Sequence, residues 1–189
     1  MNPERAVFVA WALWLASWII AALWAAPAAI WPGFGEQGPY RIVTLIGGAL
    51  LFDPFQRLYR ASFRLWDFGP AAGWLLFALA VLGFAFAWWA RLYLGRLWSS
   101  SVTRKADHHV VDTGPYAIVR HPIYTGLIAA CFATALLKGT LIGMAGAVLM
   151  TLGFAIKAKL EERFLREQLG AEAYDSYRRR VPMLVPFAR

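Results

Sequence analysis

Long apolar segments constrain the fold of this sequence more than any other feature. Residues 7–30, 73–90, 122–137 and 141–158 are strongly apolar, and about 20 helical residues cross the hydrocarbon core of a bilayer. A further apolar segment, residues 42–52, is short for a full span and predicts either a tilted helix that recruits flanking residues or a re-entrant segment. We therefore expect an all-α integral membrane protein with about five transmembrane helices, the second of them short or re-entrant.

The composition and the charge pattern agree with this class. Hydrophobic residues make up 60% of the chain, and 10 Trp are more than a soluble domain usually contains. The net charge is +8, and most Lys and Arg follow Trp89, where they flank apolar segments. This pattern suits anionic lipid at a cytoplasmic membrane face better than a nucleic-acid groove, so we expect the bilayer as a partner and no nucleic acid.

We expect one membrane-embedded domain over residues 1–189, with N-terminal helices in 1–90 and a catalytic, cofactor-binding half in 91–189. Residues 1–5 are too weakly basic for a signal peptide, which predicts that the first apolar segment is a retained transmembrane helix. The single cysteine, Cys131, lies in an apolar run and can form no intrachain disulfide. Because no Cys or suitably spaced acid accompanies His108 and His109, we expect no metal site.

The stretch of sequence most suggestive of chemistry is residues 113–126, TGPYAIVRHPIYTG. Gly114-Pro115 predicts a turn, and Pro122 predicts the first turn of a helix with His121 at or beside its N-cap. Helix N–H groups, an imidazole and the Arg120 guanidinium would then form a site for an anion such as a carboxylate. Alternatively, Arg120 and His121 are interfacial residues that snorkel from a membrane helix.

A helical hairpin is predicted to bring a second charged cluster to this stretch. Lys138-Gly139 is a short connection between two apolar segments, which forces them to be antiparallel. Glu161 and Glu162 should therefore return close to His121. Lys157 and Glu161 are spaced i, i+4 and could simply pair, but charged residues at a membrane helix end are costly enough to suggest a function.

Together these motifs resemble the isoprenylcysteine carboxyl methyltransferase family of integral membrane enzymes. The resemblance covers the chain from about Trp98 onward, and it depends on four features: Gly114-Pro115-Tyr116 through Arg120-His121-Pro122-Ile123-Tyr124, the apolar hairpin, Glu161-Glu162 and Arg180-Val181-Pro182. It implies S-adenosyl-L-methionine as the methyl donor, the carboxylate of a prenylated cysteine as the acceptor, and a cofactor pocket on the cytoplasmic face.

The resemblance also implies roles for individual residues. Glu161 would hold the amino group of the donor, and His121 with nearby helix N–H groups would face its carboxylate. Lys157 stands where the family has an arginine that steers the acceptor carboxylate, which keeps the charge but loses the bidentate fork. We therefore predict Lys157, Arg120 and Glu162 as catalytic residues. The predicted cofactor-binding residues are His108, His109, Val110, Val111, Tyr116, His121, Pro122, Ile123, Tyr124 and Glu161.

The chemistry suits this assignment, because a carboxylate is already ionised at neutral pH and needs no general base. A competing enzyme hypothesis is a phospholipid amine N-methyltransferase, which would need a base, with Glu162 as the candidate. A related fold also serves sterol reductases, although the sequence contains no dinucleotide fingerprint. The non-enzymatic alternative, a small membrane transporter or scaffold subunit, predicts polar residues in the middle of the apolar segments.

Overall fold

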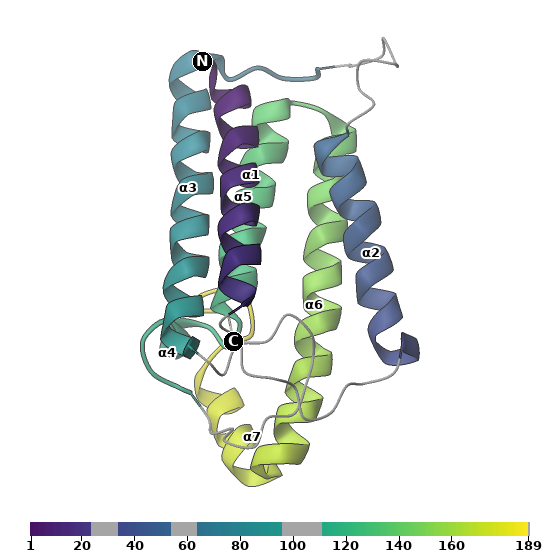
Figure 1. The fold of residues 1–189 in the computed structure, drawn as a ribbon, viewed down its shortest axis with the longest axis vertical. Helices are drawn as coiled ribbons and strands as arrows, with labels where there is room; N and C mark the ends of the chain where they lie inside the picture. The colour runs from purple at the N-terminus through teal and green to yellow at the C-terminus, as the bar shows by residue number, and fades with distance from the viewer. Residues whose placement is uncertain (24–33, 54–63, 96–110, 189) are drawn as a thin grey trace.

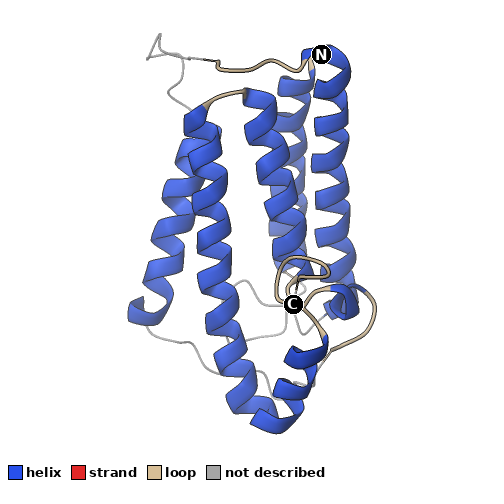
Figure 2. Ribbon diagram, turned by 180° about the vertical axis from the view of Figure 1, so that it is seen from behind, coloured by secondary structure: helices blue, strands red, loops and turns tan. Residues whose placement is uncertain are grey.

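The computed structural model describes residues 1–23, 34–53, 64–95 and 111–188, and this part of the chain contains helices and no strands (Figure 2). The all-α prediction is therefore confirmed. The helices are α1 (Pro3–Ala22), α2 (Phe34–Phe52), α3 (Gly69–Leu94), α4 (Pro115–Ile118), α5 (Pro122–Lys138), α6 (Leu141–Leu169) and α7 (Ala171–Arg180).

The long helices form the apolar body of the protein. Among the described residues, α1, α3 and α6 are long and apolar enough to cross a membrane, and α5 is a shorter apolar helix of 17 residues. In Figure 1, α3, α1 and α5 stand together, while α6 and α2 form a neighbouring pair. The short helices α4 and α7 lie at one end of this body, which we call the α4/α7 end.

Helix α2 extends beyond the apolar segment from which it was predicted, as a helix that recruits flanking residues would. It begins at Phe34 and not near residue 42, so it is 19 residues long, and Gly38-Pro39, a dipeptide typical of turns, is helical. Figure 1 shows α2 running beside α6, which does not fit a short re-entrant segment. The two backbones can approach closely because Gly47 of α2 packs against the Gly146 carbonyl of α6. Pro39 has no N–H and so leaves one helical hydrogen bond unmade. The packing against α6, which the local sequence does not reveal, compensates for this loss. The arginine-rich sequence of residues 55–66, whose pattern is typical of an amphipathic helix, lies mostly outside the described residues, and Arg64–Trp66 are not helical.

The α5–α6 hairpin forms as predicted. Gly139 ends α5 in the left-handed region, at φ 68° and ψ 27°, and Thr140 caps the start of α6. The buried Lys138 donates a hydrogen bond to the carbonyl of Leu51, at 2.6 Å, and so ties this turn to the end of α2. The Trp66 indole N–H donates to the carbonyl of Leu136, at 2.9 Å.

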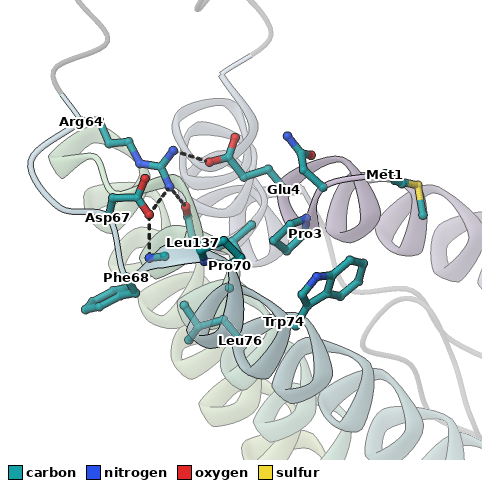
Figure 3. A pocket seen from close by; sticks show the side chains of 13 residues that line it. Met1, Pro3, Glu4, Arg64, Asp67, Phe68, Pro70, Trp74, Leu76 and Leu137 are labelled. Carbon is teal, nitrogen blue, oxygen red and sulfur yellow. Dashed lines mark hydrogen bonds and ion pairs between the residues drawn. The ribbon is translucent and has the colours of Figure 1, made fainter.

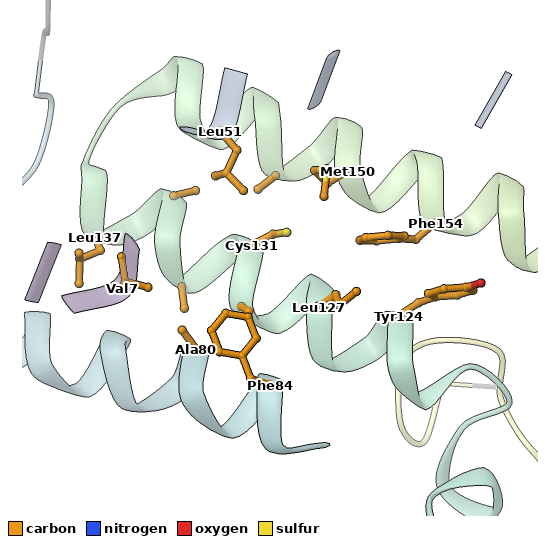
Figure 4. Packing of buried hydrophobic residues seen from close by; sticks show 14 of the residues in the cluster. Val7, Leu51, Ala80, Phe84, Tyr124, Leu127, Cys131, Leu137, Met150 and Phe154 are labelled. Carbon is orange, nitrogen blue, oxygen red and sulfur yellow. The ribbon is translucent and has the colours of Figure 1, made fainter. Parts of the chain in front are cut away.

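The core lies between α5 and its neighbours (Figure 4). Gly83 of α3 and Gly126 of α5 face each other so closely that a Cβ at either would collide with the carbonyl of the other. Phe84 contacts Trp11 of α1 edge-on, with ring centroids 4.7 Å apart. Tyr124 and Phe154 meet between α5 and α6 toward the α4/α7 end, which places the boundary of the core beside the predicted site.

Candidate active site

The Arg-His-Pro segment is held by the chain that follows α7. The backbone N–H of Arg120 donates to the carbonyl of Pro182, at 2.8 Å, and that of His121 to Met183, at 3.1 Å. The Thr125 hydroxyl donates to the carbonyl of Leu184, at 2.6 Å. Residues 182–184 thus form a clasp along the entry to α5, which fixes where the His121 and Arg120 side chains point.

His121 lies at the N-cap of α5 and is buried between two carboxylates. Its Nδ1 lies 3.5 Å from Oε2 of Glu161, and its Nε2 lies 3.1 Å from Oε1 of Glu162. Burial alone would lower the pKa of the imidazole, but the hydrogen bonds and charges of Glu161 and Glu162 outweigh burial and raise this pKa above its usual value. The His121 imidazole therefore joins two neighbouring charge clusters.

The first cluster centres on Glu161. The Tyr124 hydroxyl donates to its Oε1 at 2.7 Å, and Lys157 Nζ lies 4.0 Å from the same oxygen. The rings of His121, Tyr124 and Phe154 lie nearly parallel, at centroid separations of 5.5 and 5.4 Å. This aromatic stack and the charged groups form one surface, in which Glu161 is still 21% exposed.

A third helix completes this cluster. Lys157 Nζ lies 5.5 Å from the ring centres of both Tyr124 and Tyr40, and Tyr40 belongs to α2. The Tyr40 hydroxyl and the Arg41 guanidinium both donate to the side-chain oxygen of Gln37, at 3.0 and 2.7 Å. Since Gln37 and Arg41 are spaced i, i+4 on a helix whose middle is apolar, this spacing could have indicated the polar face of α2 from the sequence.

The second cluster centres on Glu162, which is only 7% exposed. Arg120 Nε lies 2.7 Å from its Oε1, and Arg178 Nε lies 3.3 Å from its Oε2. The Arg120 guanidinium also donates to the carbonyl of Val181. Two guanidiniums and an imidazole thus surround Glu162, which favours its ionised form and makes it a poor proton acceptor.

A model of the isoprenylcysteine carboxyl methyltransferase family matches residues 75–167, which include both carboxylates, His121, Tyr124 and Lys157. The chain belongs to this family.

Two of its relatives are named for different methyl acceptors. Protein-S-isoprenylcysteine O-methyltransferase B of Arabidopsis thaliana is 34% identical over 46% of this chain and 44% of its own length. Methanethiol S-methyltransferase of a Pseudomonas species is 32% identical over 82% of this chain and 61% of its own length. This chain therefore spans about half of these relatives.

A solved structure of a eukaryotic intramembrane Ras methyltransferase, isoprenylcysteine carboxyl methyltransferase, superposes with a TM-score of 0.57 at 23% identity. The match covers 79% of this chain and 53% of the other. It shows that the two proteins share a fold, which agrees with an integral membrane protein.

Tyr116, inside the family match, makes hydrogen bonds to α3 and α7. Its hydroxyl is directed at the carbonyl of Ala90, at 3.5 Å, and its own carbonyl accepts a hydrogen bond from Tyr177, at 2.8 Å. Burial, followed by the charge of Glu161, raises the pKa of Tyr116. The Gly114 before it has φ +57°, and a Cβ there would strike the ring of Tyr93. The predicted turn is thus present, and it directs Tyr116 toward α3 and α7.

The remaining predicted residues divide into two groups. His108, His109 and Val110 lie outside the described residues, and Val111 is partly buried where the description resumes. Pro122 is fully buried and Ile123 is partly buried in the first turn of α5. The described residues contain no group of three or more His, Cys, Asp or Glu side chains that could hold a metal.

A cavity of about 350 Å³ lies at the other end of the molecule, between the start of α1 and the start of α3 (Figure 3). Its charged lining is paired internally, since Arg64 lies 2.7 Å from Glu4 and 3.4 Å from Asp67. None of the predicted site residues lines it.

Proposed function

We propose that this chain is a membrane methyltransferase that uses S-adenosyl-L-methionine and methylates an anionic oxygen or sulfur atom of a lipophilic acceptor. The observation that carries this proposal is the Glu161 cluster, in which an acid, an imidazole, a phenol and a lysine from α5 and α6 meet within the family-matched region. The active site would then lie on the cytoplasmic face, where the positive-inside rule places the basic residues around it.

The residues present fit this donor. Glu161 is a partly exposed carboxylate that can accept hydrogen bonds from an ammonium group, and the Tyr124 and Tyr40 rings can face a sulfonium through cation–π attraction. The bound donor would supply an electrophilic methyl group. Both ring nitrogens of His121 already face carboxylates, which supports a role in positioning Glu161 more than direct contact with the carboxylate of the donor.

The charge balance favours an anionic acceptor. Lys157 and Arg41 both flank the Tyr40 ring. The Glu161 carboxylate already accepts a hydrogen bond from the Tyr124 hydroxyl and contacts the His121 ring. An anion arriving beside Lys157 would be attracted and partly stripped of water, which increases its nucleophilicity. An amine acceptor would instead need a base, and the surroundings of Glu162 disfavour that role.

Two acceptors satisfy this condition. A prenylcysteine-like carboxylate is ionised at neutral pH without assistance. A thiol is ionised only in part, but a nearby cation such as Lys157 favours its thiolate. The thiol is a second candidate because the Pseudomonas relative, named for a thiol substrate, matches far more of this chain than the Arabidopsis relative does.

The test uses the purified full chain in lipid vesicles with methyl-labelled S-adenosyl-L-methionine. Farnesylcysteine, dodecanethiol and phospholipid extract are offered separately, and each product is treated with base, which releases methanol from an ester but not from a thioether or a methylamine. We expect base-labile label on farnesylcysteine or base-stable label on the thiol. Glu161→Gln should abolish methyl transfer. The matched control Glu36→Gln, at an exposed position of α2, should keep it. Label on phospholipid amine, or no donor binding at all, would contradict the proposal.

A further inference from the structure

A second hollow, of about 400 Å³, lies at the α4/α7 end and is lined by Arg120, Asp175, Arg178 and Arg179. Three guanidiniums and one carboxylate face it, and two of the guanidiniums, those of Arg120 and Arg178, also contact the buried Glu162. Asp175 already shares its charge, because Arg166 Nη2 lies 2.9 Å from its Oδ2 and Arg178 Nη1 lies 3.7 Å from its Oδ1. The hollow therefore has an excess of positive charge and of N–H donors.

This hollow is separated from the Glu161 cluster by buried side chains. Glu162 contacts the two arginines, Arg120 and Arg178, on one side and His121 on the other, and His121 in turn contacts Glu161. Among the described residues, the Glu162–His121 contact connects this hollow to Glu161. We treat the hollow as a site distinct from the proposed donor site.

The position of the hollow in the fold suggests the ligand. Arg120 lies two residues before the start of α5, so its guanidinium lies where the apolar part of the chain begins. In a bilayer this is the level of the lipid head groups. Arginine binds phosphate well, because its planar fork donates two parallel hydrogen bonds. Arg178 is half-exposed, at 47% of its side chain, and can turn toward such a group.

We propose that this hollow binds the phosphate of an anionic phospholipid head group. Lipid binding at this site does not depend on methyl transfer, so this proposal can be correct even if the proposed function is wrong. Zwitterionic phosphatidylcholine is a weaker ligand, since its choline would meet the same positive field that attracts its phosphate.

The full chain would be placed in nanodiscs of phosphatidylcholine with a minor fraction of phosphatidylglycerol. Native mass spectrometry of the protein released from these discs measures which lipid it retains. Wild type should retain phosphatidylglycerol, and Arg179→Gln should lower its retention about tenfold, as expected for one lost charge-assisted hydrogen bond. Arg163→Gln is the matched control, because it removes the same charge from an exposed pair with Glu36 outside the hollow. Asp175→Asn should act in the opposite direction and increase retention.

Three results would overturn this proposal. Equal retention in Arg179→Gln and Arg163→Gln would show only a general charge effect. A second such result has two parts: wild type retains no phosphatidylglycerol, and inorganic phosphate stabilises wild type but not Arg179→Gln. This combination would identify a soluble phosphate as the ligand. Weaker S-adenosyl-L-methionine binding by Arg179→Gln in discs of phosphatidylcholine alone would assign the hollow to the donor site.

Discussion

Replacing Glu162 with Gln tests how the buried charge cluster holds the α4/α7 end together. The change keeps the size of the side chain but removes the charge that faces Arg120 at 2.7 Å and His121 at 3.1 Å. The Arg120 and His121 side chains are 8% and 7% exposed, so their charges would stay buried without this partner. Breaking a buried pair costs about 3–5 kcal/mol. The contact with Arg178, which is 47% exposed, adds little because solvent screens it.

The matched control is Glu36→Gln, which removes an exposed helical glutamate from its pair with Arg163, where the two side chains are 44% and 54% exposed. Such a pair contributes about 0–1 kcal/mol. Both variants would be unfolded reversibly in the same detergent micelles, followed by circular dichroism. We expect Glu162→Gln to lower the free energy of unfolding by several times the loss in Glu36→Gln. Equal losses would refute the view that Glu162 compensates buried charge.

The other predictions concern the proton on His121, the α3–α5 contact and the Glu161 cluster. Because the carboxylates raise the pKa of His121 above its ordinary 6.5, the stability that its charge provides is complete below pH 6.5 and is lost as the pH rises through the folded-state pKa. The free energy of unfolding should fall over that range in wild type and stay flatter in His121→Gln; parallel pH profiles would count against this. Gly126→Ala should lower the unfolding free energy by about 1–3 kcal/mol, since the new methyl group would collide with a carbonyl of α3. Gly48→Ala, whose methyl group would meet only a sulfur 3.8 Å away, should not be destabilised, and similar losses in both variants would contradict the packing argument. If the proposed function holds, Tyr124→Phe should raise the dissociation constant of S-adenosyl-L-methionine in calorimetric titration by about tenfold, because it removes the hydroxyl that donates to Glu161. An unchanged constant would exclude this hydrogen bond from donor binding.

Much of the fold was predictable because it depends on local patterns. The apolar lengths of α1, α3, α5 and α6 indicated membrane helices, and the Lys138-Gly139 connection indicated the hairpin. Helix α2 was predicted too short, since its first turns contain Gly and Pro and its helical state depends on packing against α6. The role of residues 182–184 as a clasp could not be predicted either, because their hydrogen bonds to 120–125 join segments that are far apart in the sequence.

The sequence by itself determined that two glutamates return to the Arg-His-Pro segment, because a hairpin of two apolar helices must bring its ends together. Only the tertiary structure decided that these glutamates have different surroundings. Consecutive residues of an α-helix point about 100° apart, so Glu161 faces Tyr124 and Lys157, while Glu162 faces Arg120 and Arg178. Tyr124 belongs to α5 and Lys157 to α6 itself, whereas Arg120 precedes α5 and Arg178 belongs to α7. The placement of these partners depends on how the elements pack together.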